Sequence, residues 1–109
     1  MVDTNPLSNC RLAFIGCGVM AEAIIAGLLR KKLVGPEQIV GSHPRQARRE
    51  EMHVKYGVEM FEQNRDAVTE TYHERPDEGS ILILAVKPQR LRKVLEELKG
   101  SLLKEQLVI

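Results

Sequence analysis

The sequence predicts an α/β fold in which a doubly wound parallel sheet lies between two layers of helices. Two observations predict it. Short apolar segments alternate with longer amphipathic segments along the 109 residues. A glycine-rich turn at residues 16–21 follows the first apolar segment and opens the first amphipathic one. The length is that of one domain, and it allows a core to be buried without disulfides or a structural metal.

Five short apolar segments are predicted as strands. Each is bounded by turn residues, as strands usually are. The fourth consists of consecutive apolar residues and is therefore expected to be buried on both faces of the sheet. Pro88 is expected to end it, because proline cannot donate a hydrogen bond to a neighbouring strand. The predicted strands are residues 11–15, 38–41, 58–61, 81–86 and 106–109.

Four segments with helical periodicity are predicted as helices. In the first, residues 23, 24, 27 and 28 form one apolar face, the last turn is basic, and Gly35-Pro36 stops it. The second is charged and ends at Gly57. The third is brief. The fourth carries four apolar residues on one face and is closed by Gly100. The predicted helices are residues 20–32, 46–56, 66–70 and 91–98.

The remaining segments are expected to lie outside the regular elements. Residues 1–10 are predicted to be a flexible N-terminal arm, and residues 11–109 the domain itself. Residues 71–79 are polar and are expected to form a surface insertion. The chain stops at the start of the fifth strand, which predicts a sheet truncated after or within that strand.

Composition excludes several classes of function. The formal net charge is +1 and only 4% of residues are aromatic, so neither a nucleic-acid surface nor an anionic membrane surface is predicted. No apolar stretch is long enough to span a membrane, and the polar leader is not a secretory signal. Two cysteines without CxxC spacing indicate a reduced, cytoplasmic chain. The three histidines lack metal-site spacing, and no metal is predicted.

The turn at residues 16–21 has the sequence pattern of a Rossmann phosphate loop, and it is called the phosphate loop below. Gly16 allows the tight turn, and Gly18 lets a pyrophosphate approach the backbone. Ala21 is small enough for the helix to pack on the strand. The first amides of the helix would then bind the phosphates. Cys17 is interpreted as a spacer between the glycines and not as a redox thiol.

The end of the second strand indicates which dinucleotide is bound. An NAD site places Asp or Glu there, whereas this chain has Ser42, His43 and Arg45. A carboxylate would repel a 2′-phosphate, while Ser42 and Arg45 could bind one. The sequence therefore favours NADPH over NADH. Arg48 and Arg49 are expected to form a solvated helix face with the neighbouring glutamates.

With these segments placed, the chain resembles the N-terminal half of pyrroline-5-carboxylate reductase, a family that forms proline. The resemblance lies in residues 14–24, in Asn64 with its neighbours and in the AVKPQ segment at residues 85–89, with consistent spacing. It implies hydride transfer from NADPH to the C=N bond of a small cyclic imine. The family's helical second domain, which makes the dimer and holds the imine, is absent. No catalytic residue can therefore be assigned, and a homo-oligomer is expected only for a longer form.

The resemblance also implies where each cofactor contact lies. The phosphate loop would hold the pyrophosphate, Ser42 and Arg45 the 2′-phosphate, and Asn64 the adenine ribose. Asn64 could equally be a helix cap, and Lys87 could be a solvated strand end. A stand-alone NADP-binding or regulatory module without activity remains an alternative. The candidate cofactor-binding residues are Gly16, Cys17, Gly18, Val19, Met20, Ala21, Ser42, His43, Arg45, Asn64, Ala85, Val86, Lys87 and Pro88.

Overall fold

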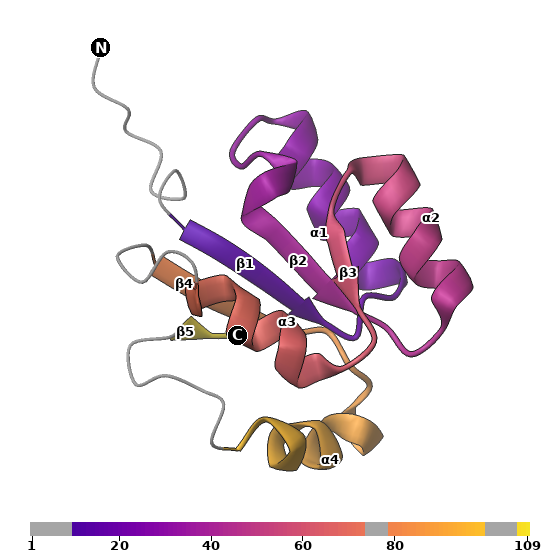
Figure 1. The fold of residues 1–109 in the computed structure, drawn as a ribbon, viewed down its shortest axis with the longest axis vertical. Coiled ribbons are helices and arrows are strands. Elements are labelled where there is room, and N and C mark those ends of the chain that lie inside the picture. The colour runs from indigo at the N-terminus through magenta and orange to yellow at the C-terminus, as the bar shows by residue number, and fades with distance from the viewer. Residues whose placement is uncertain (1–9, 74–78, 100–106) are drawn as a thin grey trace.

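The computed structural model describes residues 10–73, 79–99 and 107–109. Strands and helices alternate through these residues (Figure 1). In chain order the elements are β1 (Cys10–Ile15), α1 (Val19–Arg30), the 3-10 helix η1 (Pro36–Gln38), β2 (Ile39–Ser42), α2 (Gln46–Tyr56), β3 (Glu59–Phe61), α3 (Asn64–His73), β4 (Gly79–Leu84), α4 (Pro88–Leu98) and β5 (Leu107–Val108).

The strands form one parallel sheet in the order β3-β2-β1-β4-β5. β1 is central and pairs with β2 on one side and with β4 on the other. Its last residue, Ile15, lies opposite Ser42 of β2 and Leu84 of β4. The chain winds outward first through β2 and β3 and then through β4 and β5, so the predicted doubly wound parallel sheet is confirmed.

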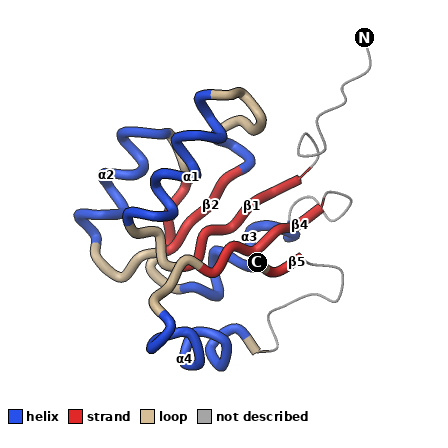
Figure 2. The backbone as a smooth tube through the Cα atoms, turned by 180° about the vertical axis from the view of Figure 1, so that it is seen from behind, coloured by secondary structure: helices blue, strands red, loops and turns tan. Residues whose placement is uncertain are grey.

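Helices cover both faces of the sheet, as expected for three layers. Leu12 and Phe14 of β1 pack with residues of α1 and α2, whereas Ala13 and Ile15 pack with residues of α3 and α4. This alternation follows from the period of two along a strand. Figure 1 shows α3 in front of the strands, and Figure 2, seen from behind, shows α1 and α2 on the opposite side.

The boundaries around β4 differ from those predicted. The strand was expected at residues 81–86 but spans Gly79–Leu84. Ala85 continues it only through one hydrogen bond, from its amide to the Ile15 carbonyl at 2.9 Å. α4 begins at Pro88 and not at residue 91. Proline has no N–H and suits the first turn of a helix, so Pro88 starts α4 rather than ending the strand.

Two further segments were assigned differently from the sequence. α3 spans Asn64–His73, so it is longer than the predicted 66–70 and includes the start of the expected loop at 71–79. The tip of that loop, at 74–78, lies outside the described residues. η1 was not predicted. It is closed by the Gln38 side chain, whose Oε1 accepts a hydrogen bond from the Gly35 amide at 2.9 Å. Cys10 belongs to β1, and the rest of the predicted arm lies outside the described residues.

α1 ends at Arg30, two residues earlier than expected, in a Schellman motif. The Leu33 amide bonds to the Leu28 carbonyl at 3.0 Å, and the Lys32 amide to the Leu29 carbonyl at 3.1 Å. Lys32 has φ 57°, the left-handed conformation that this motif requires. Glycine adopts that conformation without steric cost, so lysine is strained there.

We therefore expect Lys32→Gly to raise the free energy of unfolding by about 0.5–1 kcal/mol. Lys31 precedes it with φ −86°, where any residue fits. Lys31→Gly is the matched control and should lower stability, because the unfolded chain alone gains freedom. Urea unfolding followed by circular dichroism measures both variants. Equal effects of the two substitutions would contradict the assignment of strain to Lys32.

Candidate dinucleotide-binding site

The predicted site segments meet at one edge of the sheet. The phosphate loop follows β1, residues 42–45 end β2 and lead into α2, and residues 85–88 follow β4. These three strands are neighbours in the order β2-β1-β4 and run in the same direction. Their carboxyl ends therefore lie together, at the place where an open α/β sheet binds its ligand.

Gly16 is required at the first turn of the phosphate loop. Its φ is 80°, in the left-handed region. A Cβ atom on Gly16 would lie 2.5 Å from Cγ1 of Val86 and 3.3 Å from the Ala85 carbonyl oxygen. The loop is thus pressed against the segment that follows β4. A side chain at residue 16 would force the two apart.

Gly18 precedes α1 and leaves the helix N-terminus open. The first backbone hydrogen bond of the helix runs from the Glu22 amide to the Gly18 carbonyl at 2.9 Å. The amides of Val19, Met20 and Ala21 therefore lie in the first turn, where no carbonyl of the helix can accept from them. A Cβ on Gly18 would meet only the Gly16 carbonyl oxygen, at 4.0 Å. This open, amide-lined surface fits a pyrophosphate.

The three residues after Gly18 differ in their surroundings. The side chains of Val19 and Met20 are 85% and 70% exposed, although both are apolar. Ala21 is fully buried in the core beneath α1, in agreement with its expected packing role. Val19 and Met20 therefore border the open surface, while Ala21 holds the helix against the sheet.

Cys17 supports the loop from inside. Its side chain is fully buried, and burial raises the pKa of its thiol to about 11. Its amide donates to the Ser42 carbonyl at 2.8 Å, and its carbonyl accepts from Arg48 Nε at 3.2 Å. The thiol is protonated at neutral pH and hidden from solvent, which agrees with a spacer and not with a redox group.

Ser42 lies inside the protein, whereas the sequence suggested that it faces a 2′-phosphate. Its side chain is fully buried. The hydroxyl accepts a hydrogen bond from the Gly16 amide at 3.2 Å and donates one to Asn64 Oδ1 at 2.7 Å. Ser42 therefore ties the phosphate loop to the start of α3.

Asn64 is the first residue of α3 and so lies within the helix, whereas one reading placed it at the cap position before it. Its Oδ1 accepts from Ser42, and its Nδ2 donates to Glu97 Oε2 of α4 at 3.0 Å. The amide group thus joins β2, α3 and α4 near the site. Glu97 was not predicted, because a single glutamate on a charged helix gives no signal in the sequence.

Positive charge gathers where β2 ends. Arg45 is exposed, and its backbone amide donates to His43 Nδ1 at 3.1 Å. Arg49 Nη1 donates to the His43 carbonyl at 2.8 Å. Burial lowers the pKa of His43, and the charges of Arg45, Arg48, Arg49 and Arg90 lower it further. A neutral His43 that accepts at Nδ1 carries its proton on Nε2. We call His43, Arg45 and Arg49 the basic cluster.

Arg48 and Arg49 are not the solvated helix face that was expected. The Arg48 side chain is only 16% exposed. It contacts the Cys17 carbonyl, Glu51 and Glu22, the last with its Nη2 2.8 Å from Oε1. α2 starts directly after β2, so its first turns lie against the phosphate loop. The expectation failed because the charge pattern of a helix does not reveal what lies beside it.

Glu22, in the first turn of α1, is the centre of a polar cluster that the sequence did not predict. Oε2 accepts from the Tyr56 hydroxyl at 2.6 Å and from Lys55 Nζ at 3.0 Å. The hydrogen bond from Tyr56 lowers the pKa of Glu22 most, and those from Lys55 and Arg48 follow. Together they bring this pKa to about 2. The carboxylate is therefore charged at neutral pH, and it belongs to the same helical turn as the open amides.

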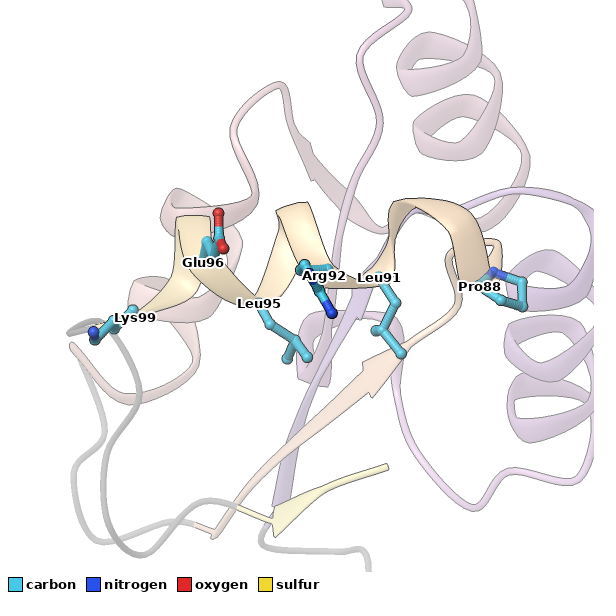
Figure 3. Close-up of a pocket in the computed structure, with 6 residues that line it drawn as sticks. All are labelled: Pro88, Leu91, Arg92, Leu95, Glu96 and Lys99. Atoms are coloured by element: carbon cyan, nitrogen blue, oxygen red, sulfur yellow. The ribbon is translucent and has the colours of Figure 1, made fainter.

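The segment after β4 completes the edge of the site. Ala85 and Val86 contact the loop, and exposed Lys87 precedes α4. An open groove on α4 begins at Pro88 and runs away from the phosphate loop (Figure 3). Its centre is apolar, at Leu91 and Leu95. Its lining is Pro88, Leu91, Arg92, Leu95, Glu96 and Lys99. It shares Pro88 with the predicted dinucleotide surface, and its other lining residues lie outside that surface.

Among residues 10–73, 79–99 and 107–109, no helix is both long and apolar enough to cross a membrane. The same part of the chain holds no group of three histidine, cysteine or acidic side chains placed to bind a metal ion.

The sheet order and the glycine loop define a Rossmann-type, NAD(P)-binding oxidoreductase domain, and sequence comparison agrees. The profile of the family described as NADP oxidoreductase, coenzyme F420-dependent, matches residues 11–109. The chain belongs to this family.

Individual relatives are more specific. The pyrroline-5-carboxylate reductase of Synechocystis sp. is 40% identical over 93 residues, which are 85% of this chain and 32% of the relative. The resemblance inferred from the sequence is thereby confirmed. The chain spans about a third of the length of the curated relatives it matches.

Solved structures match the same fold. A pyrroline-5-carboxylate reductase from Coxiella burnetii has a TM-score of 0.76 and 26% identity, over 94% of this chain and 36% of that one. The Plasmodium falciparum pyrroline carboxylate reductase, solved with NADP bound, has a TM-score of 0.70 and 21% identity, over 93% of this chain and 32% of that one.

Proposed function

We propose that this domain binds NADPH and presents it for reduction of a small cyclic imine. The observation that carries the proposal is the open N-terminus of α1 beside the basic cluster. The open helix N-terminus is suited to a pyrophosphate, and the basic cluster is suited to a 2′-phosphate. The end of β2, at residues 42–45, carries no Asp or Glu that could bind the 2′-hydroxyl of NAD.

Each part of the site has a separate task in this proposal. The amides that follow Gly18 bind the pyrophosphate. Exposed Arg45 and the Nε2 proton of His43 bind the 2′-phosphate, since Ser42 is buried and already bonded. Asn64 lies behind Ser42, on the adenosine side. Ala85, Val86, Lys87 and Pro88 border the nicotinamide side, at the carboxyl end of β4.

The reaction is proposed from the relatives, whose names specify pyrroline-5-carboxylate as substrate. When bound, NADPH supplies the hydride that reduces the C=N bond to give proline. We propose that residues 11–109 form the cofactor domain and that imine contacts and oligomer contacts come from a further domain. A cytoplasmic location is part of this proposal, because the chain has only two cysteines and they lack CxxC spacing.

Calorimetric titration of the chain with NADPH and with NADH tests the proposal. We expect tighter binding of NADPH, and a loss of roughly tenfold or more in its affinity on Arg45→Ala, because a charge-assisted hydrogen bond is removed. NADH affinity should be unchanged. Arg30→Ala is the control, since it removes an equal charge at the opposite end of α1. Equal affinity for the two dinucleotides, or no binding of either, would refute the proposed selectivity or the site itself.

A further inference from the structure

Arg48 reaches the phosphate loop from α2. Its Nε donates to the Cys17 carbonyl at 3.2 Å, and its Nη2 lies 2.8 Å from Glu22 Oε1. The guanidinium also bonds to Glu51. With 16% of its side chain exposed, Arg48 is held between the loop and the first turn of α1. It is not free to contact a ligand in solvent.

The bond to Cys17 fixes one peptide plane of the loop. The Cys17 carbonyl and the Gly18 amide belong to the same planar group, so the orientation of one sets that of the other. The Gly18 amide donates to the Gly16 carbonyl at 2.8 Å. The Cys17–Gly18 peptide, which leads into the N-cap residue Gly18, is therefore held at both of its ends. A change in its orientation would shift Gly18 and, with it, the start of α1.

The contact with Glu22 has an electrostatic consequence. A charged carboxylate in the first turn of α1 would oppose the binding of a pyrophosphate at the amides of that same turn. Arg48 and Lys55 place two positive charges on that carboxylate. Only Arg48 is largely buried, where its charge is screened least. Its charge, which it shares with Glu51, therefore offsets part of the repulsion between Glu22 and a bound anion.

We propose that Arg48 is a positioning residue of the dinucleotide site. It orients the phosphate loop and neutralises Glu22, without touching the ligand. This inference rests on the proposed function, because it concerns the same pyrophosphate surface. It is separate from the role given to Arg45, which acts on the 2′-phosphate directly.

The test compares two ligands on three variants. NADPH engages the pyrophosphate surface, whereas adenosine 2′-monophosphate has no pyrophosphate. For Arg48→Leu we expect NADPH affinity to fall about tenfold and the affinity for adenosine 2′-monophosphate to change by less than about twofold. Arg48→Lys restores the charge and should recover part of the loss. Arg30→Leu, the charge-matched control, should change neither affinity.

The outcomes separate this inference from the proposed function. Wild-type NADPH affinity in Arg48→Leu, or equal losses for both ligands, would overturn the role of Arg48 while leaving the site intact. No binding of either ligand to the unmodified chain would overturn the proposed function and this inference with it. If Arg48→Leu does not fold, Arg48→Lys decides. Weakened NADPH binding supports the role, and unchanged binding overturns it.

Discussion

Replacing Gly16 by alanine is expected to lower the free energy of unfolding by about 1–3 kcal/mol and to weaken NADPH binding at least about tenfold. The backbone at Gly16 has φ 80°, which strains any residue with a side chain. The added methyl would also lie 2.5 Å from Val86 Cγ1. Relief requires the loop or the segment after β4 to move. Movement of the loop would displace the start of α1, which directly follows it.

Gly18→Ala is the matched comparison for this prediction. Gly18 has φ −93°, and a methyl there would lie in open space, 4.0 Å from the Gly16 carbonyl oxygen. The variant should therefore keep its stability within about 0.5 kcal/mol and still lose NADPH affinity, because the methyl occupies the path of the pyrophosphate. Thermal or urea unfolding and calorimetry give the two readouts. Comparable stability losses in both variants would contradict the difference in backbone conformation and free space between Gly16 and Gly18.

These two glycines show which part of the site could be predicted from the sequence. The pattern of a strand, a glycine loop and a helix places each residue by backbone geometry, and such geometry is local. The order of the elements also predicted the parallel sheet, because short connections and right-handed crossovers leave few alternatives. Both predictions depend on neighbours in the chain, and the strand–loop–helix arrangement and the parallel sheet are both found in the structure.

The supports of the loop could not be predicted in the same way. The second strand was expected to end at Gly41, so Ser42 was placed after it and was expected to bind the 2′-phosphate. Because β2 continues through Ser42, strand alternation places its side chain on the same face as Val40, toward α3. The strand ends one residue later than predicted. For this reason Ser42, which was expected to contact the cofactor, is instead a buried residue that supports the loop.

The contacts of Arg48 could not be predicted for a different reason. Its helix was predicted correctly at residues 46–56, but nothing in the sequence states that its first turns pack beside Cys17 and Glu22. That contact joins residues 31 positions apart. Periodicity gives the face of a helix that is apolar, and it gives no information about the partner of a charged face. The arginine was therefore assigned to solvent.

Ser42→Ala separates the two roles that have been considered for this residue. As a buried support, its loss leaves the Gly16 amide and Asn64 Oδ1 without their partner. We expect the free energy of unfolding to fall by about 1–3 kcal/mol, which is typical of a buried polar group left unsatisfied. Loosening of the loop should then weaken NADPH and NADH alike. A 2′-phosphate ligand would behave differently, because its removal would weaken NADPH alone and leave stability unchanged.

Thr69→Val provides the control for Ser42→Ala, because it also removes a hydroxyl, but one that forms a single, exposed hydrogen bond. Thr69 Oγ1 donates to the Arg65 carbonyl at 2.9 Å on the exposed side of α3. Water replaces such a bond, so the change in stability should stay within about 0.5 kcal/mol. Urea unfolding and paired titrations with NADPH and NADH measure both variants. A stable Ser42→Ala that loses NADPH affinity alone would return Ser42 to the ligand role that the sequence first suggested.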